Sequence, residues 1–138
     1  MQQKSKFSEG RRKGRTVAHK RRSEQEGCEI EKWLLEYGFE RELLPGGLLM
    51  LRIRGKHMEP RMMEGDCAVL DPLASVENGA YAAVSIEGGR AEIYKVLRQK
   101  GGTLLCPHNR RYAMRFFPPE QEARLRIFGR VMRLMRNL

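Results

Sequence analysis

Residues 52–71, RIRGKHMEPRMMEGDCAVLD, constrain the fold most strongly, because they place tight turns between two short strands. Around the start of this segment, Leu48 to Ile53 alternate apolar and basic side chains, and Gly55 follows them. This alternation predicts a strand, and the glycine predicts that the strand runs into a turn. Pro60 then removes a backbone donor and keeps Glu59 out of the helical region, so the chain stays in a turn.

A second turn closes the same segment. Glu64-Gly65-Asp66 has the composition of a tight turn, and Cys67 to Leu70 is a short apolar strand that ends at Asp71-Pro72. The two strands therefore flank a rigid polar loop, which carries Lys56 and His57. We expect a loop held in this way to present a functional group.

The succession of a strand, Gly-x-x-Met-Glu-Pro, Gly-Asp, a short apolar strand and Asp-Pro resembles the LexA-type self-cleaving serine peptidases. This family includes LexA, the C-terminal domains of phage repressors and UmuD. The resemblance continues to Gly129-Arg130-Val131 and covers roughly the last three-quarters of the chain. It implies a mostly β fold, in which twisted sheets form a partial barrel with a β-ribbon after one N-terminal helix. The family's nucleophilic serine precedes the Met of the motif, and here that residue is His57.

A candidate general base lies on a later strand, where Ala91, Ile93, Lys95 and Leu97 share one face by the period of two. An ammonium on an apolar face is costly, and burial lowers the pKa of a lysine. A neutral lysine is what a Ser-Lys peptidase needs to accept the serine proton. The resemblance gives Lys95 this role, since it lies 38 residues after His57. The alternative is a lysine whose stem packs while its head reaches water.

His57 predicts that the peptidase site is inactive. An imidazole can attack a carbonyl, but no evident base and orienting group support it here. Lys56 departs from the family as well, since a polar or acidic residue is common at that position. The turns around the site are intact, so we expect the fold to be retained.

The net charge is concentrated at the N-terminus. Residues 1–22 carry nine Lys or Arg against one acid, a net charge of +8, whereas the rest of the chain contributes only +2. Residues 1–26 are almost devoid of apolar side chains, which predicts a disordered basic arm or hinge ahead of a single domain at 27–138. The alternatives for the arm are a solvated linker and a contact with nucleic-acid phosphates. The candidate phosphate-binding residues are Arg11, Arg12, Lys13, Arg15, Lys20, Arg21 and Arg22.

The resemblance also implies a scissile Ala-Gly bond in the hinge, for which Glu9-Gly10 is the nearest counterpart. The charged Glu9 departs from the small residue of the family pattern. The family places a DNA-binding helix-turn-helix before the hinge. We find none, and such a domain would need roughly 50–60 more residues.

Cysteine usage and hydropathy predict a cytoplasmic protein without membrane association. Cys28, Cys67 and Cys106 form an odd, widely spaced set, which indicates neither a disulfide framework nor a zinc knuckle. Cys106-Pro-His108 has no recognised ligand spacing even with His57 added, so we expect no metal or other cofactor. No apolar run reaches membrane-spanning length, and residues 1–25 lack the apolar centre of a signal peptide.

Hydrophobic periodicity predicts the remaining elements. An amphipathic helix is expected at Cys28 to Tyr37, with Trp33 in the core, and another helical turn at Glu40 to Leu44. Further strands are expected at Ala80 to Ile86, Ala91 to Leu97 and Thr103 to Cys106. A loop is expected at Pro107 to Phe117. Residues 120–138 fit a helix start after Pro118-Pro119 and also alternation from Ile127 to Met135, and the resemblance favours a final strand.

The predicted function is that of a degenerate repressor C-terminal domain, which serves dimerisation and regulation of transcription in a response of the SOS type. We expect a homodimer formed through the last strand, whose edge would otherwise be unpaired. The resemblance also implies a RecA-type co-effector. The alternatives are an active Ser-Lys self-cleaving peptidase in the serine form and a nucleic-acid-binding accessory protein that uses the basic arm.

Overall fold

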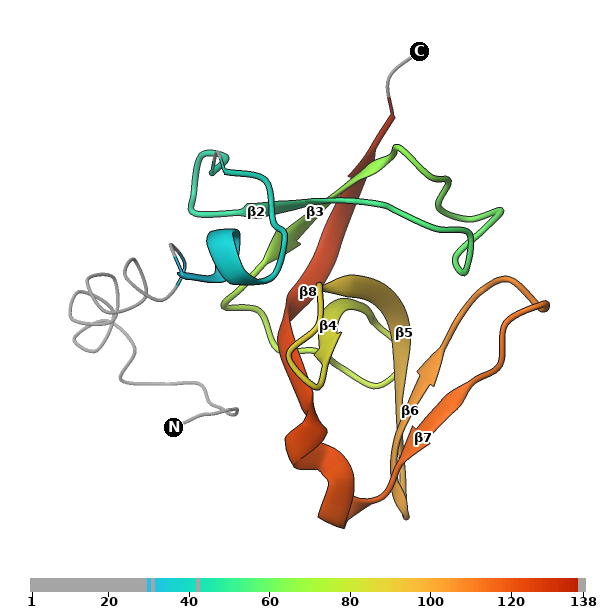
Figure 1. The fold of residues 1–138 in the computed structure, drawn as a ribbon. Coiled ribbons are helices and arrows are strands. Elements are labelled where there is room, and N and C mark those ends of the chain that lie inside the picture. The colour runs from blue at the N-terminus through green and yellow to red at the C-terminus, as the bar shows by residue number, and fades with distance from the viewer. Residues whose placement is uncertain (1–29, 31, 42, 137–138) are drawn as a thin grey trace.

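The computed structural model describes residues 30, 32–41 and 43–136. Seven strands form one antiparallel sheet in the order β2-β3-β8-β4-β5-β6-β7 (Figure 1). The strands are β2 (Leu49–Arg52), β3 (Cys67–Asp71), β4 (Tyr81–Ile86), β5 (Glu92–Gln99), β6 (Gly102–Cys106), β7 (Arg115–Phe117) and β8 (Leu125–Met135). The predicted mostly β fold is confirmed.

Strand β8 joins the two parts of the sheet. Residues 130–135 pair with β3, and residues 125–130 pair with β4. Both ladders shift register near the middle of β8, where Gly129 has a φ of 157°. A Cβ at Gly129 would lie 2.3 Å from the main-chain oxygen of Asp71, so only glycine allows β3 to approach this closely. The long β8 in Figure 1 therefore connects the β2–β3 part of the sheet to the part that begins with β4.

The sheet encloses two hydrophobic clusters. In the larger cluster, Phe128 packs against the rings of Trp33, Tyr37 and Phe39, with centroid distances of 5.1, 4.8 and 5.2 Å. The predicted placement of Trp33 beside the core is therefore confirmed. The smaller cluster consists of Ala82, Val84, Val96, Leu105 and Phe117. Because Ile93 belongs to the first cluster and Val96 to the second, β5 contributes side chains to both cores.

The structure corrects two predictions about local elements. Residues 40, 41, 43 and 44 are not helical, because the Glu40 amide donates to Met50 O at 2.9 Å and Leu44 forms a bridge with Leu48. The predicted loop at Pro107 to Phe117 ends in strand β7, which pairs with β6. Residues 30 and 32–36 are helical as expected, and residues 28 and 29 of that predicted helix lie outside the described part.

Both interpretations of the C-terminal segment contribute to the structure, since the 3₁₀ helix η1 (Pro119–Arg124) leads directly into β8. The predicted unpaired edge of residues 127–135 is present only in part, because residues 125–130 pair with β4 and residues 130–135 pair with β3. Residues 1–26, with Glu9, Gly10 and the basic candidates of the arm, lie outside the described residues. Within the described ranges, no helix combines the length and apolar character needed to cross a membrane.

Candidate functional site

The loop between β2 and β3 holds His57 through its own backbone hydrogen bonds. The Glu59 amide donates to Lys56 O at 3.2 Å, and the Met62 amide donates to Met58 O at 2.9 Å. The Glu59–Pro60 peptide bond is cis. Met58 is fully buried in the larger core cluster, so it anchors the loop beside His57.

Asp66 closes this loop from the other side. Its carboxylate accepts a hydrogen bond from the Met63 amide at 2.9 Å and two from the Arg136 guanidinium at 2.8 and 2.7 Å. Hydrogen bonding from Arg136 lowers the pKa of Asp66, although burial acts in the opposite direction. The Gly-Asp element of the motif thus ties the His57 loop to the end of β8.

His57 is buried, with 7% of its surface exposed, and it is engaged on several sides. Its Nε2 lies 2.9 Å from Ile93 O, and since a carbonyl only accepts, Nε2 carries the proton. Its Nδ1 lies 3.6 Å from Glu92 Oε1. The ring packs against Tyr94 at a centroid distance of 4.8 Å and meets Tyr112 at 6.3 Å. The imidazole is therefore a packed, hydrogen-bonded part of the structure.

Asn109, which the sequence analysis did not identify, fixes the backbone at His57. Its amide donates to His57 O at 2.9 Å, and its side-chain Nδ2 donates to Lys56 O at 2.9 Å. The loop between β6 and β7 consequently lies against the loop between β2 and β3 (Figure 1). Asn109 lies in an otherwise basic loop that begins with a proline, and nothing in that pattern indicates a partner more than 50 residues away.

Lys95 lies on β5, two residues beyond the carbonyl that His57 binds, and pairs in register with Tyr81 and Cys106. Its side chain is exposed, so the prediction of an apolar environment was wrong. Ile93 and Lys95 share one face of β5. Ile93 belongs to the larger core cluster, and Lys95 lies beyond the edge of that cluster. Among the described residues, no hydrogen bond or ion pair joins Lys95 to His57. The His57 ring is bonded to β5 at Ile93, and Lys95 lies two residues further along the same strand.

Tyr94 and Cys106, which lie near His57 and Lys95, both have raised pKa values. Burial raises the pKa of Tyr94, and the Glu92 carboxylate adds to that effect. Burial also raises the pKa of the Cys106 thiol, against the opposing effect of Lys95. A protonated thiol is a weak nucleophile, so burial makes Cys106 a poor candidate for a nucleophile.

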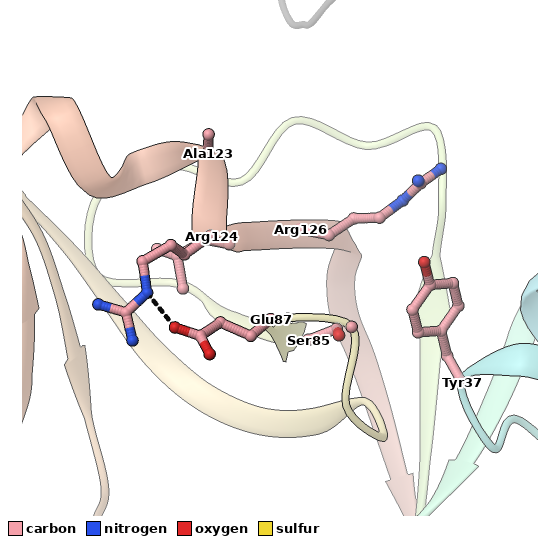
Figure 2. A pocket seen from close by; sticks show the side chains of 8 residues that line it. Tyr37, Ser85, Glu87, Ala123, Arg124 and Arg126 are labelled. Atoms are coloured by element: carbon pink, nitrogen blue, oxygen red, sulfur yellow. Dashed lines mark hydrogen bonds and ion pairs between the residues drawn. The ribbon is translucent and has the colours of Figure 1, made fainter.

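A hollow of about 480 Å³ lies at the C-terminal end of β4 (Figure 2). It contains Ser85, whose hydroxyl donates to Gly89 O at 2.6 Å, and the ion pair of Arg124 with Glu87. The Ser85 side chain is buried and its proton is already donated to a backbone carbonyl. Ser85 therefore does not supply an alternative hydroxyl nucleophile.

His108, the remaining candidate metal ligand of the sequence analysis, is exposed. Over the residues that the structure describes, no group of three His, Cys, Asp or Glu side chains is arranged to hold a metal ion.

Comparison with known proteins agrees with the motif and the fold. The Peptidase S24-like family matches residues 22–132, which is most of the chain. The LexA repressor of Acidiphilium cryptum (strain JF-5) is 29% identical over 94 residues, covering 67% of this chain and 39% of that protein. The chain thus spans about two fifths of the length of this curated relative. The match over residues 22–132 confirms the resemblance, and the chain belongs to the Peptidase S24-like family.

Proposed function

We propose that this chain is a regulatory domain of the S24 family that has lost self-cleavage. The observation that carries the proposal is the state of His57, which occupies the nucleophile position of the motif. Its Nε2 proton is donated to Ile93 O, and its ring is packed against Tyr94. A residue used in this way serves the structure of the loop.

The chemistry of the site supports this proposal. Acyl transfer in the family needs a hydroxyl within reach of a lysine that can accept its proton. Here the nucleophile position carries an imidazole, and Lys95 has an exposed side chain that forms no hydrogen bond or ion pair with it among the described residues. The other ring nitrogen of His57, Nδ1, lies 3.6 Å from Glu92 Oε1. With an imidazole at position 57, the site has no pair of a hydroxyl and a lysine.

Dimerisation through β8 is the second part of the proposal. Residues 131–135 of β8 pair with β3 on one side, and no described strand pairs with the opposite side of this half. Met132 and Met135 are 51% and 38% exposed there. An open strand edge beside apolar side chains is suited to pairing with a second copy. In the relative from Acidiphilium cryptum the matching part belongs to a repressor, and we extend regulation of transcription, within a response of the SOS type, to this chain.

Mass spectrometry of the unmodified protein, held for hours between pH 7 and about pH 10, tests the loss of self-cleavage. We expect the intact mass throughout. A new fragment that forms in the unmodified protein and is absent from His57→Ala would show that His57 supports catalysis, and the proposal would be wrong.

A further inference from the structure

The loop between β6 and β7, residues 107–114, has a defined shape although it is highly exposed. Besides its two bonds to the His57 loop, Asn109 accepts hydrogen bonds from the Arg111 amide at 3.0 Å and from the Tyr112 amide at 3.0 Å. These bonds fix the directions in which the following side chains leave the backbone. The surface is therefore preformed, which reduces the entropy cost of binding a partner.

Three cations gather where the two loops meet. Lys56, Arg110 and Arg111 are exposed, and the side chain of none of them forms a hydrogen bond or ion pair with another described residue. No acidic residue occurs between positions 107 and 117. The folded part of the chain is nearly neutral overall, so this concentration of unpaired positive charge is local. It fits an anionic partner.

Two exposed aromatic rings lie on the same β6–β7 hairpin as Arg110 and Arg111. Tyr112 is 47% exposed and Phe116 is 48% exposed, whereas the next residue of β7, Phe117, is only 2% exposed in the smaller core cluster. Tyr112 touches the structure through the His57 ring, and Phe116 lies opposite Leu104 on β6. Each ring thus has one side supported by the protein and a large part open to solvent.

We propose that Lys56, Arg110, Arg111, Tyr112 and Phe116, here termed the ribbon surface, bind single-stranded nucleic acid independently of its sequence. Phosphates pair with the three cations, and unpaired bases stack on the two rings. A duplex hides its base faces and could use only the cations. A second copy of this chain would bring like charges together across the contact. This surface is on the folded domain, separate from the basic arm and from the proposed loss of cleavage.

The charge contribution is tested by fluorescence anisotropy of a labelled 20-nucleotide oligothymidine, with the full chain, between 50 and 200 mM salt. Arg110→Ser/Arg111→Ser should weaken binding and make the log–log salt slope shallower by about 1.4, because each phosphate neutralised on a single strand contributes about 0.7 to that slope. Lys32→Ser/Arg41→Ser is the matched control, because it removes two exposed cations that lie outside both loops. The basic arm is present in every variant, so its contribution cancels. An equal weakening in the control pair would overturn the ribbon surface as the site.

The stacking contribution is tested with Tyr112→Leu and Phe116→Leu, which keep apolar bulk and remove the planar ring. Each should weaken binding about tenfold. Met114→Leu, at a neighbouring side chain that is 63% exposed, should leave affinity unchanged. Phe116→Trp should preserve or strengthen binding, which keeps the test decisive if a leucine variant unfolds. If the rings have no effect, or if an acidic peptide displaces the oligonucleotide with higher affinity, the surface takes another class of anion and the proposal is refuted.

Discussion

Replacing His57 by serine should destabilise the fold, because the imidazole now carries structural interactions. Removal of the Nε2–H donor leaves the main-chain oxygen of Ile93, a residue only 1% exposed, without its partner, which costs about 1–3 kcal/mol. Removal of ring packing against Tyr94 costs a further ~0.5–1.5 kcal/mol. We therefore expect the free energy of unfolding to fall by about 3 kcal/mol. At a few degrees per kcal/mol, the melting temperature should fall by roughly 10 °C.

Urea unfolding at one fixed protein concentration measures this destabilisation and avoids a shift caused by association. His57→Phe is the informative control, because it keeps a ring against Tyr94 and still removes the donor to Ile93 O. Its stability should lie between those of the parent and His57→Ser. A double-mutant cycle with Tyr94→Leu should give a coupling energy of about 0.5–1.5 kcal/mol between the two rings. If His57→Ser unfolds at the same urea concentration as the parent, our structural account of His57 is incorrect.

Three further predictions concern the rest of the fold. Gly129→Ala should destabilise the fold by about 1–3 kcal/mol more than Gly88→Ala. Both glycines have positive φ, but only at Gly129 would the added Cβ meet backbone, at 2.3 Å from Asp71 O. Equal melting temperatures for the two variants would contradict this. The pKa of Asp66 is lowered from 3.8 in the fold, so its ionised form stabilises the protein above that pH. This stability should be lost as pH falls through the folded-state value, and Asp66→Asn should flatten the acid limb of a stability–pH curve. Sedimentation should show a dimer at micromolar concentration that Met132→Lys weakens, and a monomer up to about 100 μM would exclude the proposed use of β8.

Local sequence signals predicted most strands because their causes are local. Alternation and flanking glycines located β3, β4 and β5 to within two residues. The Met-Glu-Pro and Gly-Asp turns likewise located the His57 loop. The segment at 40–44 failed, because pairing of Glu40 with Met50 overrides its helical propensity.

Features that depend on contacts between distant parts of the chain could not be predicted from local sequence patterns. The three-residue strand β7 exists because β6 pairs with it, and the central position of β8 follows from the order of pairing. Alternation placed Lys95 on the face of Ile93 but could not show that the core ends there, which leaves Lys95 exposed. The clamp formed by Asn109 joins two loops far apart in the chain, so only the folded structure reveals it.

We attribute the proposed loss of self-cleavage to the imidazole at position 57, since the Met-Glu-Pro and Gly-Asp turns of the motif are retained beside it. Mass spectrometry of His57→Ser/Glu9→Ala, held for hours at about pH 9–10, tests it most directly once that variant is shown to be folded. Glu9→Ala is included because Ala-Gly is the family's scissile pair. We predict cleavage in the basic hinge that is faster at high pH, because a base must accept the serine proton, and we predict that adding Lys95→Ala eliminates this cleavage. A folded variant that keeps its full mass under these conditions would show that the site has lost more than its nucleophile.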